Sequence, residues 1–213
     1  MGFFPILAPA LDIHPVPARV PDPAGIQAVL VSSANALPGL SAAWHILPLF
    51  TVGTATAARA RAAGFADIRD ADADAAALAA LVAGTCRPVA GPLLLLAGQG
   101  QGMELAKALR AAGFRVIRRV VYAARPIADL AAPARAALAA GQVGHALFFS
   151  AATALAFLRQ LHRADMVELL CHVEAIAIGQ PARVALQSVP WRRIRVASRP
   201  TQDAMLACLR CAQ

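Results

Sequence analysis

Four short turns of this 213-residue sequence contain the residue types that bind anions. Each turn follows an apolar run, and small or hydroxyl residues there leave backbone N–H groups free at the start of a helix, where they attract negative charge. Ordinary helix capping by Ser, Thr and Asn uses the same residues, and on composition alone capping is the favoured interpretation. The turns are Ser32–Asn35, Gly53–Thr56, Gly98–Gly102 and Ser150–Thr153.

The glycine-rich turn Gly98–Gly102 invites comparison with nucleotide-binding loops. A dinucleotide fingerprint needs G-x-G-x-x-G, but Met103 stands where the third glycine belongs. Residues 105–128 contain no acid that could bind a ribose, and the Gly-Lys-Ser/Thr of a P-loop is missing. We therefore expect no nucleotide cofactor at this turn.

Cysteine and histidine residues give little sign of a metal or redox centre. The Cys208-x-x-Cys211 pair lies inside a predicted carboxyl-terminal helix, and only Cys171-His172 could complete a metal site. We interpret these cysteines as small apolar residues. The five histidines have no metal-ligand spacing, and no acid is placed to complete a catalytic triad. The sequence predicts no metal, no cofactor and no nucleophilic catalysis.

Tyr122 is the sole tyrosine and ends the apolar run Val116–Tyr122. A phenol stays protonated at neutral pH and can donate a proton to a reacting group. Taken without further information, a buried aromatic residue with a satisfied hydroxyl is the simpler interpretation.

The elements that would position these residues alternate along the chain. Short apolar runs without polar alternation are typical of parallel strands buried on both faces, and helical segments separate them, which predicts an α/β fold with parallel sheets. Eight strands favour two sheets. The expected strands are Phe3–Ala8, Ala28–Ser32, Leu47–Val52, Leu93–Ala97, Val116–Tyr122, Ala146–Ser150, Ala175–Ile178 and Ile194–Ala197. The expected helices are Thr54–Ala63, Asp74–Val82, Met103–Ala112, Ala128–Ala140, Ala151–Leu161, Arg183–Gln187 and Thr201–Leu209.

Two details of this pattern concern connections. The Ala-Gly-Phe endings at residues 63–65 and 112–114 predict helix ends with a left-handed glycine. The long extended stretch Arg115–Arg125 suits a strand that crosses between two domains, with Phe3–Pro9 as its partner strand.

Composition bounds the class of protein. A hydrophobic content of 59% with only 15% charged residues excludes a disordered chain, and four cysteines are too few for a disulfide scaffold. The mean hydropathy is +0.58, and Ala136–Leu158 carries no charge. Its interior, Gly141–His145, is polar, so we expect a loop, a strand and a helix start there rather than a membrane span. No signal peptide is evident, which predicts a cytoplasmic protein without membrane contact.

The charge is concentrated in the second half of the chain. Residues 1–109 carry five Arg, one Lys and seven acids, whereas residues 110–213 carry fourteen Arg and five acids, within a formal net charge of +8. A basic half suits an anionic partner, although a solvated arginine-rich surface would look the same. The arginines are dispersed and lack interleaved aromatic residues, so nucleic acid is disfavoured.

Several segments form an ordered set over nearly the whole chain: Val29–Ala36, Val52–Arg59 followed by Ala63–Phe65, Val120–Tyr122, Phe148–Ser150 with Phe157, Ile178–Gly179, and Val196–Thr201 followed by Met205–Leu206. In this order the chain resembles the uroporphyrinogen-III synthase family. The resemblance implies two flavodoxin-like parallel-sheet α/β domains joined by a two-stranded linker, with the active site in the interdomain cleft. The domains would be residues 10–118 and residues 119–213, the latter completed by a linker strand over residues 1–9.

The family cyclises the polycarboxylate hydroxymethylbilane to uroporphyrinogen III without a cofactor, losing water and inverting ring D through a spiro intermediate. The resemblance implies that Tyr122 is the proton donor and that the substrate meets Ser33, Asn35, Gly53, Thr56, Gly98, Ser150, Gly179 and Thr201. It also implies a monomer that could receive its substrate from hydroxymethylbilane synthase, in haem, sirohaem or cobalamin biosynthesis. The competing interpretation is a degenerate, two-lobed protein that binds an anionic ligand without catalysis.

The sequence departs from the family pattern at two places. It begins where the family's second strand is expected, so one strand–helix unit is expected to be absent. The turn Gln180–Arg183 replaces the threonines of many relatives, which predicts altered carboxylate binding there.

Overall fold

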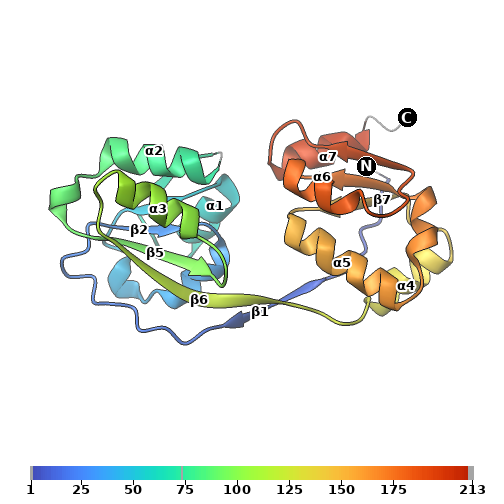
Figure 1. Cartoon of the computed structure of the whole chain (residues 1–213), viewed down its shortest axis with the longest axis horizontal. Coiled ribbons are helices and arrows are strands. Elements are labelled where there is room, and N and C mark those ends of the chain that lie inside the picture. The colour runs from blue at the N-terminus through green and yellow to red at the C-terminus, as the bar shows by residue number, and fades with distance from the viewer. Residues whose placement is uncertain (1, 73, 211–213) are drawn as a thin grey trace. The chain divides into compact units, whose positions relative to one another are not determined.

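The computed structural model describes residues 2–72 and 74–210, which form two compact units (Figure 1). Residues 13–124 make up the middle unit, and residues 1–12 with 125–213 make up the terminal unit. The division falls after Ala124, inside strand β6 (Val116–Pro126), whereas the sequence placed the boundary between residues 118 and 119 of the same strand.

The larger sheet has six strands in the order β1-β6-β5-β2-β3-β4. Every pair from β6 to β4 is parallel, as the apolar runs predicted for β2, β3, β5 and β6. The hydrogen bonds from Val16 to Val121 and from Ile127 to Ala10 show that β1 runs antiparallel to β6. The other strands are β1 (Leu11–Pro15), β2 (Ala28–Val31), β3 (Leu49–Thr51), β4 (Ile68–Asp70) and β5 (Leu93–Gly98).

Successive residues of these strands feed two separate apolar clusters, one on each face of the sheet. Val29 and Val31 belong to the cluster that includes Ala60 of α1 (Thr54–Ala62) and Leu37 of the 3-10 helix η1 (Ala34–Gly39). On the opposite face, Leu30 packs with α2 (Ala75–Thr85) and α3 (Met103–Ala111). Short 3-10 helices η2 (Ala42–Trp44) and η3 (Pro88–Ala90) complete the unit. Burial on both faces explains why β2 and β5 lack polar alternation.

The two Ala-Gly-Phe segments end α1 and α3 as expected. Gly64 and Gly113 have φ of +100° and +88°, and the amides of Phe65 and Phe114 bond back to Ala60 and Leu109. Both phenylalanines are buried, so each helix end is closed by a left-handed glycine and an apolar contact.

The terminal unit contains a parallel sheet of β7 (His145–Phe148), β8 (Glu174–Ala177) and β9 (Arg193–Val196), in that order. Helix α7 (Gln202–Arg210) packs on one face, against Ile176. The other helices share the larger apolar cluster: α4 (Ala132–Ala139), α5 (Ala151–Arg163), α6 (Gln180–Leu186) and the 3-10 helix η4 (Val167–His172). The uncharged stretch 136–158 divides among α4, β7 and α5, and no helix within the described residues is long and apolar enough to cross a membrane.

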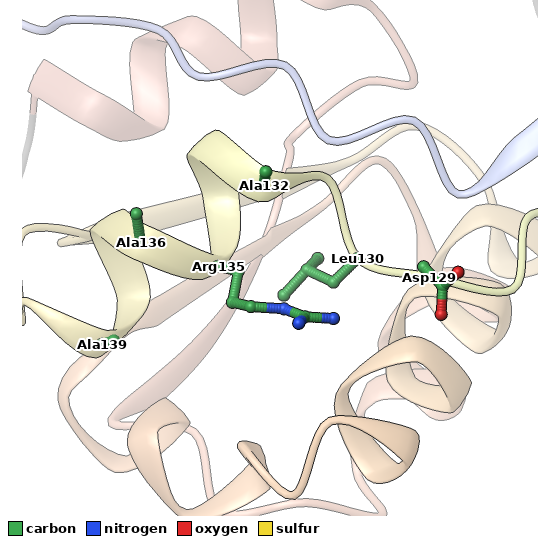
Figure 2. A pocket seen from close by; sticks show the side chains of 6 residues that line it. All are labelled: Asp129, Leu130, Ala132, Arg135, Ala136 and Ala139. Carbon is green, nitrogen blue, oxygen red and sulfur yellow. The ribbon is translucent and has the colours of Figure 1, made fainter.

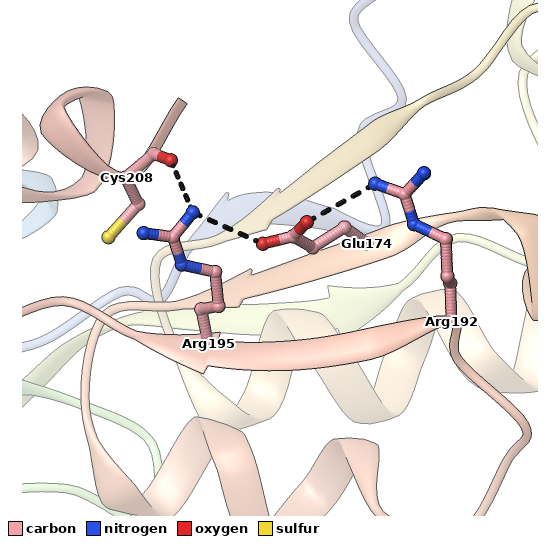
Figure 3. A network of polar contacts seen from close by, with 4 residues as sticks. All are labelled: Glu174, Arg192, Arg195 and Cys208. Carbon is pink, nitrogen blue, oxygen red and sulfur yellow. Dashed lines mark hydrogen bonds and ion pairs between the residues drawn. The ribbon is translucent and has the colours of Figure 1, made fainter. Parts of the chain in front are cut away.

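One buried carboxylate links β8, β9 and α7 (Figure 3). Glu174 is 3% exposed and accepts from Arg192 at 3.3 Å and from Arg195 at 3.4 Å. Arg195 also donates to the carbonyl of Cys208 at 2.8 Å. A buried charge of this kind is tolerated because two guanidinium groups pair with it.

Two predictions of strand positions were wrong. Residues 3–8 form no strand, and the antiparallel partner of β6 is β1, at residues 11–15. The prediction rested on the apolar character of residues 3–8. Pro5 and Pro9 lack the N–H groups that a sheet ladder requires, so this run does not pair as a strand. Strand β4 was missed because its three residues include Arg69 and Asp70.

Of the cysteine pair, Cys208 is buried and Cys211 lies outside the described residues.

Candidate active site

Most of the candidate residues of the middle unit lie at one edge of its sheet. Strands β6, β5, β2 and β3 are adjacent and parallel, so their carboxyl ends share this edge. The segments after β2 and β3 carry the candidates Ser33, Asn35, Gly53 and Thr56. Gly98 is the last residue of β5, and Tyr122 lies beside it on β6. The fold therefore brings together residues that are up to ninety positions apart, as expected for ligand binding in an open α/β sheet.

Ser33 is the N-terminal cap of η1. Its hydroxyl accepts from the amide of Asn35 at 3.3 Å, and both residues are partly exposed. The capping interpretation of this turn therefore holds in the free protein.

The start of α1 is different because Gly53 offers no side chain to cap it. The φ of Gly53 is −150°, which any residue adopts, and a Cβ at this position would meet no atom within 4 Å. The amide of Thr56 bonds to the carbonyl of Gly53 at 3.0 Å. Glycine is thus not needed here for folding, and its small size leaves room beside the first amides of α1, which suits an approaching anion.

Gly98 is required by its neighbour Tyr122. A Cβ at Gly98 would lie 2.7 Å from ring atoms of Tyr122, too close for a side chain. The pairing of β5 with β6 shifts by one residue between Ala97, which faces Val120, and Gly98, which faces Tyr122. This bulge places the ring directly against the glycine backbone, as bulges commonly re-aim a side chain beside a site.

The hydroxyl of Tyr122 donates to the side-chain oxygen of Gln101 at 2.9 Å, and the residue is only 3% exposed. The expectation of a buried aromatic with a satisfied hydroxyl is therefore met in the free protein. Tyr122 also lies at the sheet edge, and its hydroxyl bonds to Gln101, an exposed residue of the turn that follows β5.

The candidates of the terminal unit form a second group, at the carboxyl ends of β7, β8 and β9. Ser150 caps α5: its hydroxyl accepts from the amide of Thr153 at 3.0 Å and lies 2.8 Å from the hydroxyl of Thr153. Gly179 precedes α6 with extended backbone at φ −173°. The hydroxyl of Thr201 accepts from the amide of Ala204 at 3.3 Å, at the start of α7. All three residues lie where parallel strands lead into helices, which is the position expected of them.

A surface hollow lies elsewhere, along α4 (Figure 2). It has a volume of about 690 Å³ and is lined by Asp129, Leu130, Arg135 and three alanines. Figure 2 shows the Arg135 side chain extending along it. None of the candidate residues lines this hollow. Within the described residues, no three His, Cys, Asp or Glu side chains lie close enough to share a metal ion.

Gln101, the partner of Tyr122, was not among the predicted site residues. The turn Gly98–Gly102 was interpreted as a possible anion-binding turn and was rejected as a nucleotide-binding motif, and in neither interpretation did the Gln101 side chain have a role. The signal was a glutamine between two glycines directly after a buried strand, because glycines on both sides let the backbone turn and leave the one side chain free to reach a neighbour.

A known protein family matches this chain. The family model described as uroporphyrinogen-III synthase HemD matches residues 1–207. The chain belongs to the uroporphyrinogen-III synthase family. It is therefore a cyclising lyase of tetrapyrrole biosynthesis.

One solved structure supports the fold. The uroporphyrinogen-III synthetase of Helicobacter pylori matches with a TM-score of 0.67 at 19% identity, covering 96% of this chain and 91% of that one. A mutant uroporphyrinogen III synthase of Thermus thermophilus matches at 19% identity with a TM-score of 0.49, covering 99% of this chain and 90% of that one. No curated protein matches the sequence. The Helicobacter pylori match thus shows that the two α/β units have the uroporphyrinogen-III synthase fold.

Proposed function

We propose that this chain converts hydroxymethylbilane into uroporphyrinogen III, with Tyr122 as the proton donor. The observation that carries this proposal is the position of the Tyr122 phenol at the carboxyl edge of the larger sheet, in a chain of this family. A buried group at such an edge is within reach of a ligand bound over the strand ends.

The first step is loss of the substrate's terminal hydroxyl group. The Tyr122 proton passes to that oxygen, the C–O bond breaks, water leaves, and the electron pair of the pyrrole nitrogen completes an azafulvene cation. Ring D attacks this carbon through its substituted position and gives the spiro intermediate, which fragments and recloses with ring D inverted. The proton released when the pyrrole regains aromaticity restores the phenol. Each step needs positioning more than strong acid or base chemistry.

Carboxylate binding is the second requirement. The amides at the starts of α1 and α3 lack side-chain caps, since Gly53 and Gly102 precede them. Together with Ser33, Asn35 and Thr56, these N–H donors would bind some of the carboxylates of the substrate. Ser150, Gly179 and Thr201 would serve the same purpose at the strand ends of the terminal unit. We place the reaction in the cytoplasm, the compartment that a low cysteine content favours.

The product isomer tests this proposal directly. Freshly generated hydroxymethylbilane closes spontaneously to the type I isomer, so the protein should raise the fraction of type III after oxidation to uroporphyrin. Only type I product at any protein concentration would contradict the proposal.

A further inference from the structure

The hydrogen bond between Tyr122 and Gln101 fixes where the phenol proton points. The hydroxyl donates to Oε1 of Gln101 at 2.9 Å, while the Tyr122 ring is wedged against the backbone of Gly98. The ring is therefore held by packing, and the direction of its proton is set by the Gln101 side chain.

Apart from the bond to Tyr122, Gln101 is held in place through its backbone. Its carbonyl accepts from Nε of Arg118 at 2.9 Å, and its amide donates to the carbonyl of Gly98 at 3.0 Å. Gly100 and Gly102 on either side have φ of +75° and +74°, a conformation that glycine adopts without strain. Gln101 is exposed, so its side chain is free to leave Tyr122 without disturbing buried packing.

We propose that Gln101 is the positioning residue of the Tyr122 proton. This inference rests on the proposed function of Tyr122. In the free protein the amide oxygen of Gln101 aligns and covers the hydroxyl. When the substrate's hydroxyl oxygen takes the proton, the C–O bond breaks, water leaves, and the Tyr122 oxygen becomes a phenolate.

A primary amide suits both the state before proton transfer, when Tyr122 is a phenol, and the state after it, when Tyr122 is a phenolate. Its oxygen accepts from the phenol, and a rotation of the amide group then presents its N–H to the phenolate, which stabilises the charge left on Tyr122. A carboxylate of the same size retains the acceptor but lacks the donor, and an apolar side chain lacks both. The variant Gln101→Glu therefore tests the loss of the donor alone, and Gln101→Leu tests the loss of donor and acceptor together.

The sole tyrosine allows a direct readout on the protein alone. Protein grown with tyrosine labelled with ¹³C at Cζ gives one NMR signal, whose shift reports the hydrogen bond of the phenol. We expect Gln101→Leu to move this signal. The matched control Gln99→Leu, at an exposed position two residues away in the same turn, should not move it. An unmoved signal in Gln101→Leu would overturn the inference.

Kinetics on hydroxymethylbilane complete the test. Both Gln101 variants should lower kcat for type III formation by about tenfold or more, with KM changed far less, because they act on the proton and not on carboxylate binding. Gln99→Glu, which adds the same charge nearby, should leave kcat unchanged. An active wild type with unchanged kcat in both folded Gln101 variants would overturn only this inference. A wild type that makes no type III isomer would instead reject the proposed function.

Discussion

Gly98 is the residue whose replacement has the most direct structural consequence. A Cβ there would lie 2.7 Å from the Tyr122 ring and 2.9 Å from its hydroxyl oxygen, so Gly98→Ala must displace the ring or the strand. We expect the free energy of unfolding to fall by about 1–3 kcal/mol, the usual cost of overpacking. Urea denaturation followed by circular dichroism measures this change.

The control for that variant is Gly84→Ala, in α2, where a Cβ meets no atom within 4 Å. This change should stabilise the protein by roughly 0.5–1 kcal/mol, because alanine is the better helix residue. Equal stabilities of Gly98→Ala and the wild type would contradict the tight packing of Tyr122 on Gly98.

Cysteine reactivity is a second prediction at this scale. Cys86 is partly exposed, and burial raises the pKa of its thiol, an effect that nearby Arg69 partly opposes. Since the thiolate is the reactive form and a raised pKa makes it scarcer at neutral pH, iodoacetamide should modify Cys86 more slowly than the exposed Cys171. Peptide mapping by mass spectrometry after short exposure tests this order. Faster labelling of Cys86 would contradict it.

Several residue positions were predictable from local pattern, and others were not. The turns that carry Ser33 and Ser150 follow buried strands, so their place at helix starts could be predicted. The contact of Tyr122 with Gln101 could not, because it depends on a one-residue shift between β5 and β6 that no local pattern encodes. The roles of the nine candidate residues in the reaction remain predictions.

At the scale of elements, the pairing of Glu174 with Arg192 and Arg195 ties β8 to β9 and, through Cys208, to α7. Glu174→Gln removes the buried negative charge that Arg192 and Arg195 both contact. We expect a loss of about 2 kcal/mol or more in the free energy of unfolding. Glu168→Gln, at an exposed position on η4, is the control and should change stability little. An unaffected Glu174→Gln variant would show that the pairing contributes nothing.

Strand and helix types were largely predictable, because runs such as Leu93–Gly98 are buried on both faces and helix ends have glycine signals. The exceptions have physical causes. Strand β4 is three residues long and half polar, and β1 alternates weakly with a proline at its end, so both owe their strand conformation to the neighbours that they pair with.

At the scale of the whole molecule, each unit has its own apolar core and its own tryptophan. Trp44 is 3% exposed in the middle unit. In the terminal unit, Trp191 packs edge-on against Phe148 at 5.6 Å and donates to the carbonyl of Leu186. The variants Trp191→Phe and Trp44→Phe therefore report on one unit each by fluorescence.

With these reporters, Glu174→Gln should lower the urea midpoint read from Trp191 and leave the midpoint read from Trp44 in place. Gly98→Ala should lower the urea midpoint read from Trp44 and leave the midpoint read from Trp191 in place. This outcome follows because separate cores unfold as separate units. Equal shifts of both midpoints in either variant would contradict separate cores.

The most direct measurement compares the wild type with Tyr122→Phe in one assay, which follows the initial rate of uroporphyrinogen III formation from hydroxymethylbilane and the ratio of the type III to the type I isomer. We expect the wild type to make predominantly type III and Tyr122→Phe to make it about 100-fold more slowly, the usual contribution of a general acid. A Tyr122→Phe variant that forms type III at the wild-type rate would contradict the central role of Tyr122.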